Sequence, residues 1–181
     1  MGLLARQVVL AHLKDEIARA LRWASHHHLE HTWNEDSLTF MVRLEGHAND
    51  AGDREAYLLT GIFDDYRVLP PTWRFLDPRT GEDTGNTGFP HPGSFPGGSV
   101  LHSNGVVCAA WNRLAFKTAE NPTGVHEDWG DLAGWEKVGS TYTQARTIPD
   151  MLARLRAEVA LSPHRLAPLQ PLDPPADEGA A

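Results

Sequence analysis

Apolar residues near the start of the chain recur at spacings of three and four residues, with charged residues between them. Leu10, Leu13, Ile17 and Leu21 follow this pattern. Because an α-helix turns once every 3.6 residues, these side chains fall on one face. The pattern predicts an amphipathic helix over residues 3 to about 24, which buries that face against the rest of the protein.

The pattern changes to alternation of apolar and polar residues from residue 37 to residue 45, which is typical of a strand with one buried face. Residues 46–53 (GHANDAGD) have the composition of a turn, and the apolar stretch 56–63 (AYLLTGIF) follows. Together these segments predict an antiparallel hairpin. Residues 72–76 (TWRFL) predict a short third strand.

A second helix is predicted to begin near Thr147. Thr147 and Asp150 have the spacing of a capping box, and Pro149 occupies the first turn, where a missing N–H costs little. Pro163 marks the end of this helix. Its buried stripe is expected to consist of apolar residues at helical spacing, namely Met151, Leu152, Leu155 and Val159.

A long segment between these elements, residues 77–105, is rich in Gly, Pro, Ser, Thr and Asn. Connections of this length inside a domain usually carry function or are mobile. The segment leads directly to Cys108. Beyond it, Trp111 and Phe116 are expected in the core, and residues 120–131 predict an exposed acidic loop.

The order of helix, strands, long loop and helix separates the two kinds of element and predicts an α+β fold. A chain of 181 residues can bury a substantial core. We predict a single domain over residues 1–169 and a disordered, Pro-rich acidic tail over residues 170–181.

Charge and composition narrow the expected partners. The formal net charge is −8, which disfavours nonspecific binding to nucleic acid or to anionic membranes, so neither is expected as a partner. No apolar run approaches the length of a membrane span. Polar residues interrupt the segment from Met1 to Leu13, so no signal peptide is expected and a cytoplasmic location follows. One cysteine excludes an intramolecular disulfide.

Four pieces of the chain, in order, resemble the ubiquitin-conjugating (E2, UBC) family. Residues 57–76 (YLLTGIFDDYRVLPPTWRFL) are similar to its strand, tyrosine-containing turn, Pro-Pro pair and following strand. Residues 104–108 (NGVVC) are similar to the approach to its catalytic cysteine. Trp135 corresponds to a tryptophan after that cysteine, at a longer spacing. Residues 147–163 (TIPDMLARLRAEVALSP) are similar to the helix that follows.

The resemblance implies a UBC-like fold with an N-terminal helix, an antiparallel meander of about four strands, an active-site loop and C-terminal helical structure. It implies that Cys108 carries a ubiquitin-like protein as a thioester, received from an E1-like activating enzyme and passed to an amine of a target protein. The chain departs from typical E2 proteins in a way that resembles bacterial E2-like proteins, which are encoded together with these partners. Some of these bacterial systems act in antiphage defence. No cofactor is implied.

One motif of the family is missing. E2 proteins usually carry His-Pro-Asn shortly before the cysteine, and its asparagine supports the oxyanion or the nearby loop. Here the candidates for that supporting role are Asn104, His102 and His91, in that order. The acidic residue that the family carries beyond the cysteine has two possible counterparts, Asp128 and Asp131. Tyr66 and the Pro70–Pro71 pair are expected to fix the turn that supports the active-site loop.

The chemistry of such a carrier explains why these residue types matter. A thioester requires a sulfur nucleophile, and Cys108 is the only cysteine. Charge develops on the carbonyl oxygen during transfer, and one preorganised donor there is worth roughly 3–4 kcal/mol. A histidine or a carboxylate could help to remove the proton of the incoming amine. The alternative for Cys108 is a buried structural role beside its apolar neighbours.

Three other functions remain open on the sequence alone. The first is a non-catalytic binding module on the same fold, as in inactive E2 variants. The second is a cysteine hydrolase that pairs Cys108 with His102, His91 or His126. The third is a metal-binding protein that uses His26–His28 and His31, if these residues share a helix face.

Overall fold

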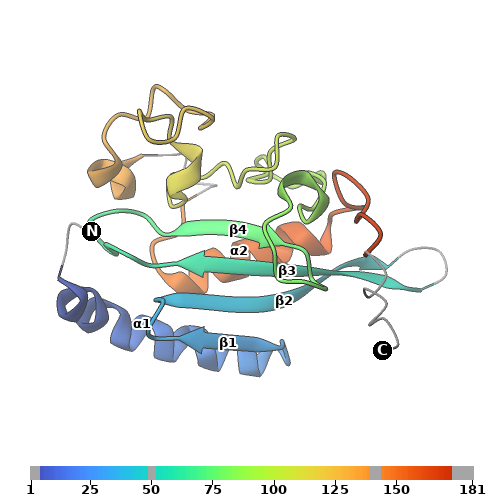
Figure 1. The fold of residues 1–181 in the computed structure, drawn as a ribbon, viewed down its shortest axis with the longest axis horizontal. Helices are drawn as coiled ribbons and strands as arrows, with labels where there is room; N and C mark the ends of the chain where they lie inside the picture. The colour runs from blue at the N-terminus through green and yellow to red at the C-terminus, as the bar shows by residue number, and fades with distance from the viewer. Residues whose placement is uncertain (1–4, 49–51, 139–143, 173–181) are drawn as a thin grey trace, which may run out of the picture.

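The computed structural model of the chain describes residues 5–48, 52–138 and 144–172 (Figure 1). It is an α+β structure in which one helix precedes an antiparallel sheet and one follows it, as predicted. Its elements are α1 (Arg6–His26), β1 (His31–Asn34), β2 (Thr39–Ala48), β3 (Arg54–Ile62), β4 (Thr72–Leu76) and α2 (Ile148–Ala160), with short 3-10 helices η1 (Gly85–Thr87), η2 (Arg113–Ala115) and η3 (Leu132–Lys137).

The four strands form one antiparallel sheet in the order β1-β2-β3-β4. The predicted hairpin is β2–β3, in which Val42 pairs with Leu59, and its register shifts between Glu45 and Ala48. Every second residue of β2 is buried, which confirms the alternation of the sequence. This topology is compatible with a UBC-like fold.

The helices complete the core. α1 contacts β1 and α2, and α2 contacts β2. Figure 1 shows α2 behind the middle of the sheet and α1 along the edge formed by β1. The predicted apolar stripe of α2 is fully buried. Its N-cap is Thr147, whose hydroxyl oxygen accepts a hydrogen bond from the Asp150 N–H at 3.3 Å. None of the described helices is long and apolar enough to cross a lipid bilayer.

Strand β1 lies where the sequence pattern predicted no strand. α1 ends at His26, and His28 has a left-handed backbone with φ of 55°. His31 then begins β1, where it pairs with Val42. The interpretation of His27 and His31 as one helix face is therefore wrong, because the helix has ended between them. Within the described ranges, no group of three or more metal-ligating side chains lies together.

A buried carboxylate joins three elements of the fold. Glu16 of α1 is 3% exposed. Its Oε2 accepts hydrogen bonds from the Tyr66 hydroxyl at 2.9 Å and from the Ile148 N–H at 2.9 Å, and its Oε1 pairs with Arg67. Burial and the neighbouring carboxylate raise the pKa of the Tyr66 hydroxyl, which therefore keeps its proton as the donor. Glu16 thus fixes the turn after β3 and the start of α2 to α1.

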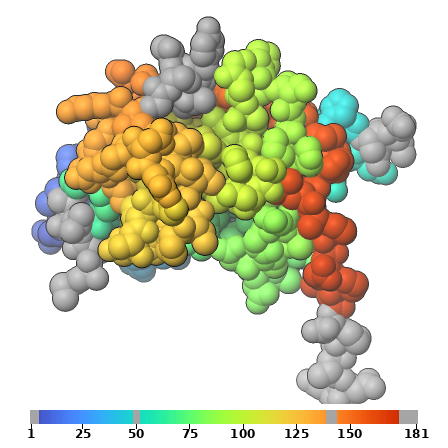
Figure 2. All heavy atoms as spheres, turned by 90° about the horizontal axis from the view of Figure 1, so that it is seen from above, coloured from blue at the N-terminus to red at the C-terminus, as the bar shows by residue number. Residues whose placement is uncertain are grey.

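Parts of the long segment after β4 pack against the rest of the chain, whereas residues 79–86 are exposed. Phe89, Val100 and Leu101 of this segment are buried. Figure 2 shows residues of the segment 77–108, coloured green to yellow-green, beside the segment 110–138, coloured yellow to orange, on one face of the molecule. The predicted disordered tail falls mostly on residues 173–181, which lie outside the described ranges.

Candidate active site

Cys108 is held by main-chain contacts at the end of the long segment. Leu101 and Val107 form an isolated antiparallel bridge, and the Cys108 N–H donates to the Val100 carbonyl at 2.6 Å. Cys108 is intermediate in exposure, whereas its neighbours Val107 and Ala109 are buried. Anchored neighbours and a partly accessible residue are the combination that a nucleophilic sulfur requires.

A buried glutamate of α2 anchors the strand-like stretch that precedes the cysteine. Glu158 is fully buried. Its carboxylate accepts hydrogen bonds from the Ser99 hydroxyl at 2.6 Å and from the Val100 N–H at 3.0 Å. Arg154 donates to the same carboxylate at 2.9 Å and to the Gly98 carbonyl. Because Val100 in turn accepts from Cys108, α2 positions the cysteine through this chain of contacts.

A buried amide connects the sheet to the same region. Asn112 is fully buried, and its Oδ1 accepts from the Trp73 N–H of β4 at 2.9 Å. Its Nδ2 donates to the Val107 carbonyl at 2.8 Å, one residue before the cysteine. An uncharged side chain that satisfies a donor and an acceptor fits a buried site well. Asn112 therefore fixes the residues on both sides of Cys108 to β4.

The Pro-Pro pair supports the segment that follows the cysteine. The Pro71 carbonyl accepts from the Arg113 N–H at 2.9 Å, and the Pro70 carbonyl accepts from the Arg113 guanidinium at 3.2 Å. The same guanidinium pairs with Asp64 at 3.2 Å. Tyr66 lies in the same turn, and its hydroxyl donates a hydrogen bond to Glu16. The turn and the segment around η2 thus stabilise each other, in agreement with the role expected for Tyr66 and the prolines.

The side chain that contacts the cysteine sulfur is His126. Its Nε2 lies 2.9 Å from Cys108 Sγ. The ring is placed by the main chain, because the His126 N–H donates to the Ala115 carbonyl at 3.0 Å and the His126 carbonyl accepts from the Lys117 N–H at 2.9 Å. Phe116 and His126 form an isolated parallel bridge. The two contacting side chains therefore come from segments that are joined backbone to backbone.

Two further residues border the imidazole. Asp128 Oδ1 lies 3.6 Å from His126 Nδ1, on the side of the ring away from the sulfur-facing Nε2. The indole of Trp129 stacks on the ring with centroids 3.6 Å apart and planes 8° apart, and Phe116 meets that indole edge to face. The order Cys108, His126, Asp128 is the arrangement of a nucleophile, a base and an orienting carboxylate.

Burial favours the protonated form of the Cys108 sulfur, because it raises the pKa of the thiol above its ordinary value. The thiolate is the reactive form, so attack on an acyl group requires that the proton leave the sulfur at the moment of reaction. A neutral imidazole within hydrogen-bond reach can accept that proton.

The leading sequence candidates for a supporting group, Asn104 and His102, lie in the turn that precedes Val107. His102 and Asn104 are exposed and contact each other, with His102 Nδ1 2.7 Å from Asn104 Oδ1. They form the turn between Leu101 and Val107, and Gly105 continues it with φ of 79°. Their contacts in the structure are local to this turn.

His91 and Asp131 have structural contacts of their own. The His91 N–H donates to the His164 carbonyl at 2.8 Å, and the two rings lie 4.7 Å apart, so His91 fixes the segment after α2. Asp131 caps η3 by accepting from the Ala133 N–H at 3.1 Å. Of the two acidic candidates, Asp128 is the one that borders the histidine beside Cys108.

The sequence indicates His126 only as a partner of Cys108 in a hydrolase, and it does not identify Trp129, Glu158 or Glu16 as site residues. His126 lies in the stretch expected to be an exposed acidic loop. An aromatic residue such as Trp129 is unusual in such a loop and indicates a packing contact. Glu158 continues the buried stripe of α2 at helical spacing after Leu155, and Glu16 does the same after Leu13. A carboxylate on an apolar helix face is a sign of buried hydrogen-bond partners.

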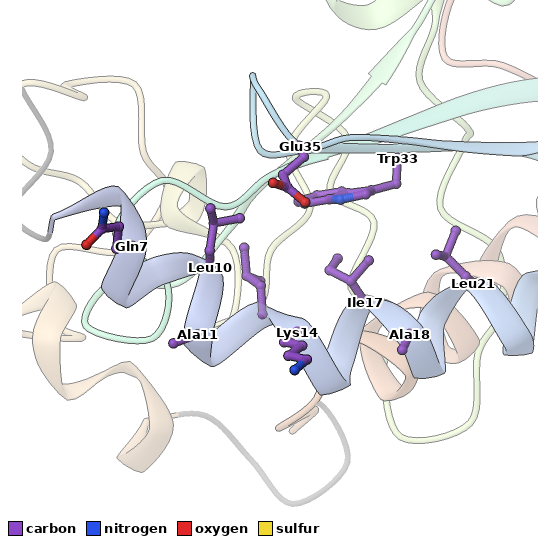
Figure 3. A pocket seen from close by; sticks show the side chains of 10 residues that line it. Gln7, Leu10, Ala11, Lys14, Ile17, Ala18, Leu21, Trp33 and Glu35 are labelled. Carbon is purple, nitrogen blue, oxygen red and sulfur yellow. The ribbon is translucent and has the colours of Figure 1, made fainter.

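A separate groove of about 530 Å³ lies between α1 and the end of β1. In Figure 3, Leu10, Ile17 and Leu21 extend from α1 on the side that faces Trp33. Lys14 and Glu35 also line the groove. α1 contacts β1, whereas η2, which follows Cys108, contacts β4. The groove and the cysteine therefore lie toward opposite edges of the sheet.

Comparison of the chain with models of known protein families, with curated proteins and with solved structures gave no match.

Proposed function

We propose that the protein is an E2-like acyltransferase, which carries a ubiquitin-like protein as a thioester on Cys108. It receives this cargo from an E1-like activating enzyme and passes it to an amine of a target protein. The proposal includes a bacterial, cytoplasmic setting, with antiphage defence as the biological role that the resemblance implies.

The observation that carries the proposal is the contact between a partly exposed cysteine sulfur and an imidazole nitrogen at 2.9 Å. It supports covalent acyl chemistry at Cys108 over a buried structural role. The order of elements around the site, an N-terminal helix, a four-stranded meander, a long loop and a helix, supports an E2-like carrier over other acyl-transfer classes. The retained contact also argues against a purely non-catalytic binding module.

The test requires a ubiquitin-like protein and its E1-like enzyme, which are to be sought among the genes that neighbour the one for this chain. Incubated with both and ATP, the protein should form an adduct that a thiol reductant removes. Cys108→Ala should abolish the adduct. Any adduct of Cys108→Ser should be an ester, which a thiol reductant does not remove. A wild-type chain that forms no adduct with active partners would sink the proposal.

A cysteine hydrolase is the second candidate, and the carboxylate beside the histidine favours it. Cys108, His126 and Asp128 have the order of roles found in cysteine hydrolases. A fusion of a ubiquitin-like protein to a short C-terminal peptide separates the two activities. Turnover of this fusion with no activating enzyme or ATP would establish the hydrolase, and an E2-like carrier should leave it intact.

A further inference from the structure

We propose that His126 is the catalytic acid–base of acyl transfer at Cys108, and that Asp128 and Trp129 are positioning residues for its ring. The inference rests on the proposed function, because it names the group that moves the protons in that reaction. His126 Nε2 lies at hydrogen-bond distance from the reacting sulfur, which is the geometric condition for a general base.

The surroundings of the ring determine which nitrogen faces the sulfur as an acceptor. Asp128 Oδ1 lies 3.6 Å from Nδ1, so a proton on Nδ1 is directed toward a carboxylate. In a neutral imidazole the other nitrogen then presents its lone pair, and here that nitrogen is Nε2 beside Sγ. We infer this tautomer from the arrangement of Asp128 and Cys108 around the ring.

The charged groups around the ring are compatible with a transient positive charge. Cys108 and Asp128 face its two nitrogens, and the Lys117–Glu127 ion pair lies on the two adjoining backbone segments. The face of Trp129 covers the ring at a centroid distance of 3.6 Å. An indole face attracts a cation, and the carboxylate does the same from the edge, so both favour the imidazolium that forms when Nε2 takes a proton.

Loading of the carrier needs only this one base to move the proton. The donor is the thioester of the ubiquitin-like C-terminus on the activating enzyme. The bond from Cys108 Sγ to the acyl carbon forms while the bond from the donor sulfur breaks. The Sγ proton passes to His126 Nε2 and from there to the departing donor thiolate, so His126 ends the step neutral.

Discharge reverses the direction of the proton transfer. The target amine nitrogen forms a bond to the acyl carbon, and the bond to Cys108 Sγ breaks. One proton of the amine passes to Nε2 and then to the departing Cys108 thiolate. The product is an amide and a free thiol, with no oxidant, reductant or metal required. One histidine in contact with the sulfur can therefore assist both half-reactions.

The experiment uses the full chain and a synthetic donor, a peptide that ends in Gly-Gly as the thioester of 2-mercaptoethanesulfonate. Intact-mass spectrometry follows acylation of Cys108 and its discharge to added lysine. His126→Ala should slow both steps roughly 10²–10⁴-fold, and imidazole added to the buffer should restore part of each rate. His47→Ala, which removes an exposed histidine at the end of β2, should react as the wild type does.

A second variant distinguishes the loss of the base from a folding defect. His126→Gln keeps a polar side chain of similar reach but no base, so it should melt as the wild type does and still react slowly. Wild-type rates in this variant would overturn the inference, as would slow reaction of folded His126→Ala without any rescue by imidazole. A wild-type chain that takes no acyl group from the thioester counts against the carrier function itself, which is a different result.

Discussion

At the residue scale, the site depends on polar side chains that lie inside the protein with their partners. Glu158, Asn112 and Glu16 are each almost fully buried, and each forms a hydrogen bond to a segment other than its own. Buried polar groups destabilise a fold unless they are paired, so their positions are tightly constrained. Such residues position Cys108 through the main chain of Val100 and Val107.

The pH dependence of Cys108 is the first prediction. Since burial raises the pKa of the thiol, the rate of alkylation by iodoacetamide should rise with pH through an inflection above the roughly 8.5 of an ordinary thiol. Unfolding the protein in urea should lower that inflection to the ordinary value. The single cysteine makes alkylation specific to this residue. A folded-state rate already at its plateau near pH 7 would show a preformed thiolate and contradict the prediction.

At the element scale, α2 supports the loop that carries Cys108. It lies behind the sheet (Figure 1). Its buried face carries both apolar side chains and Glu158. α1 has the same combination, with Glu16 on its buried face. Each helix therefore has two functions, to cover the sheet and to fix a loop by a carboxylate.

The support of the loop by α2 gives the second prediction. Glu158→Gln should weaken the hold on Ser99 and Val100 and thereby loosen the bond from Cys108 to Val100. Hydrogen exchange of the peptide that spans residues 99–108 should become faster, and acylation of Cys108 should slow. Arg156→Ala, an exposed change two residues earlier on the same helix, is the matched control and should change neither. Equal exchange in the two variants would refute the supporting role.

The stability of the α1 contacts gives the third prediction. Glu16→Ala leaves the Tyr66 hydroxyl and the Ile148 N–H without their acceptor, and each unsatisfied buried group costs about 1–3 kcal/mol. We expect the free energy of unfolding to fall by about 3 kcal/mol in urea titrations. Asp15→Ala, at the exposed neighbouring position, should change it by less than about 0.5 kcal/mol. Similar losses in both variants would contradict this account.

At the scale of the whole molecule, the sheet separates the groove of α1 from the cysteine. The groove lies at the β1 edge, and the segment that carries Cys108 and His126 lies beyond β4 (Figures 1 and 2). A partner that docks at the groove would therefore not cover the reacting sulfur from the same surface. Such a separation allows one surface to select the donor and another to carry out the transfer.

This arrangement gives the fourth prediction, which rests on the proposed function. Charge reversal at Lys14, Arg19 and Arg22 to glutamate should weaken loading by the activating enzyme, because the resemblance to the E2 family implies that the first helix binds that enzyme. The same variant should accept acyl groups from the small synthetic thioester at the wild-type rate. Enzymatic loading that survives the reversal would count against docking at α1.

Much of the fold could be predicted from residue patterns because each long element has a clear period. Both helices, the β2–β3 hairpin and β4 lie within a few residues of their predicted positions. β1 was not located, since four residues at a sheet edge, half of them exposed, show no apolar alternation. α1 ends among the histidines directly before β1, so the sequence shows no clear boundary at which the strand begins.

The site could be predicted only in part. Cys108 stands out because it is the single cysteine after a long loop. Its contact with His126 joins residues eighteen apart and depends on the bridge between Phe116 and His126, which is a tertiary feature without a local pattern. Proximity in sequence favoured His102 and Asn104, but the tight turn directs these side chains toward each other.

The bridge between Phe116 and His126 has a kinetic consequence. Main-chain hydrogen bonds hold both Cys108 and His126, so under the proposed function the freedom that the two groups must lose in order to react is lost already when the chain folds. Such preorganisation lowers the entropic part of the barrier. The activation entropy of acyl transfer within the loaded complex should accordingly be close to zero, and the temperature dependence of that step should reflect the enthalpy of bond exchange at the sulfur.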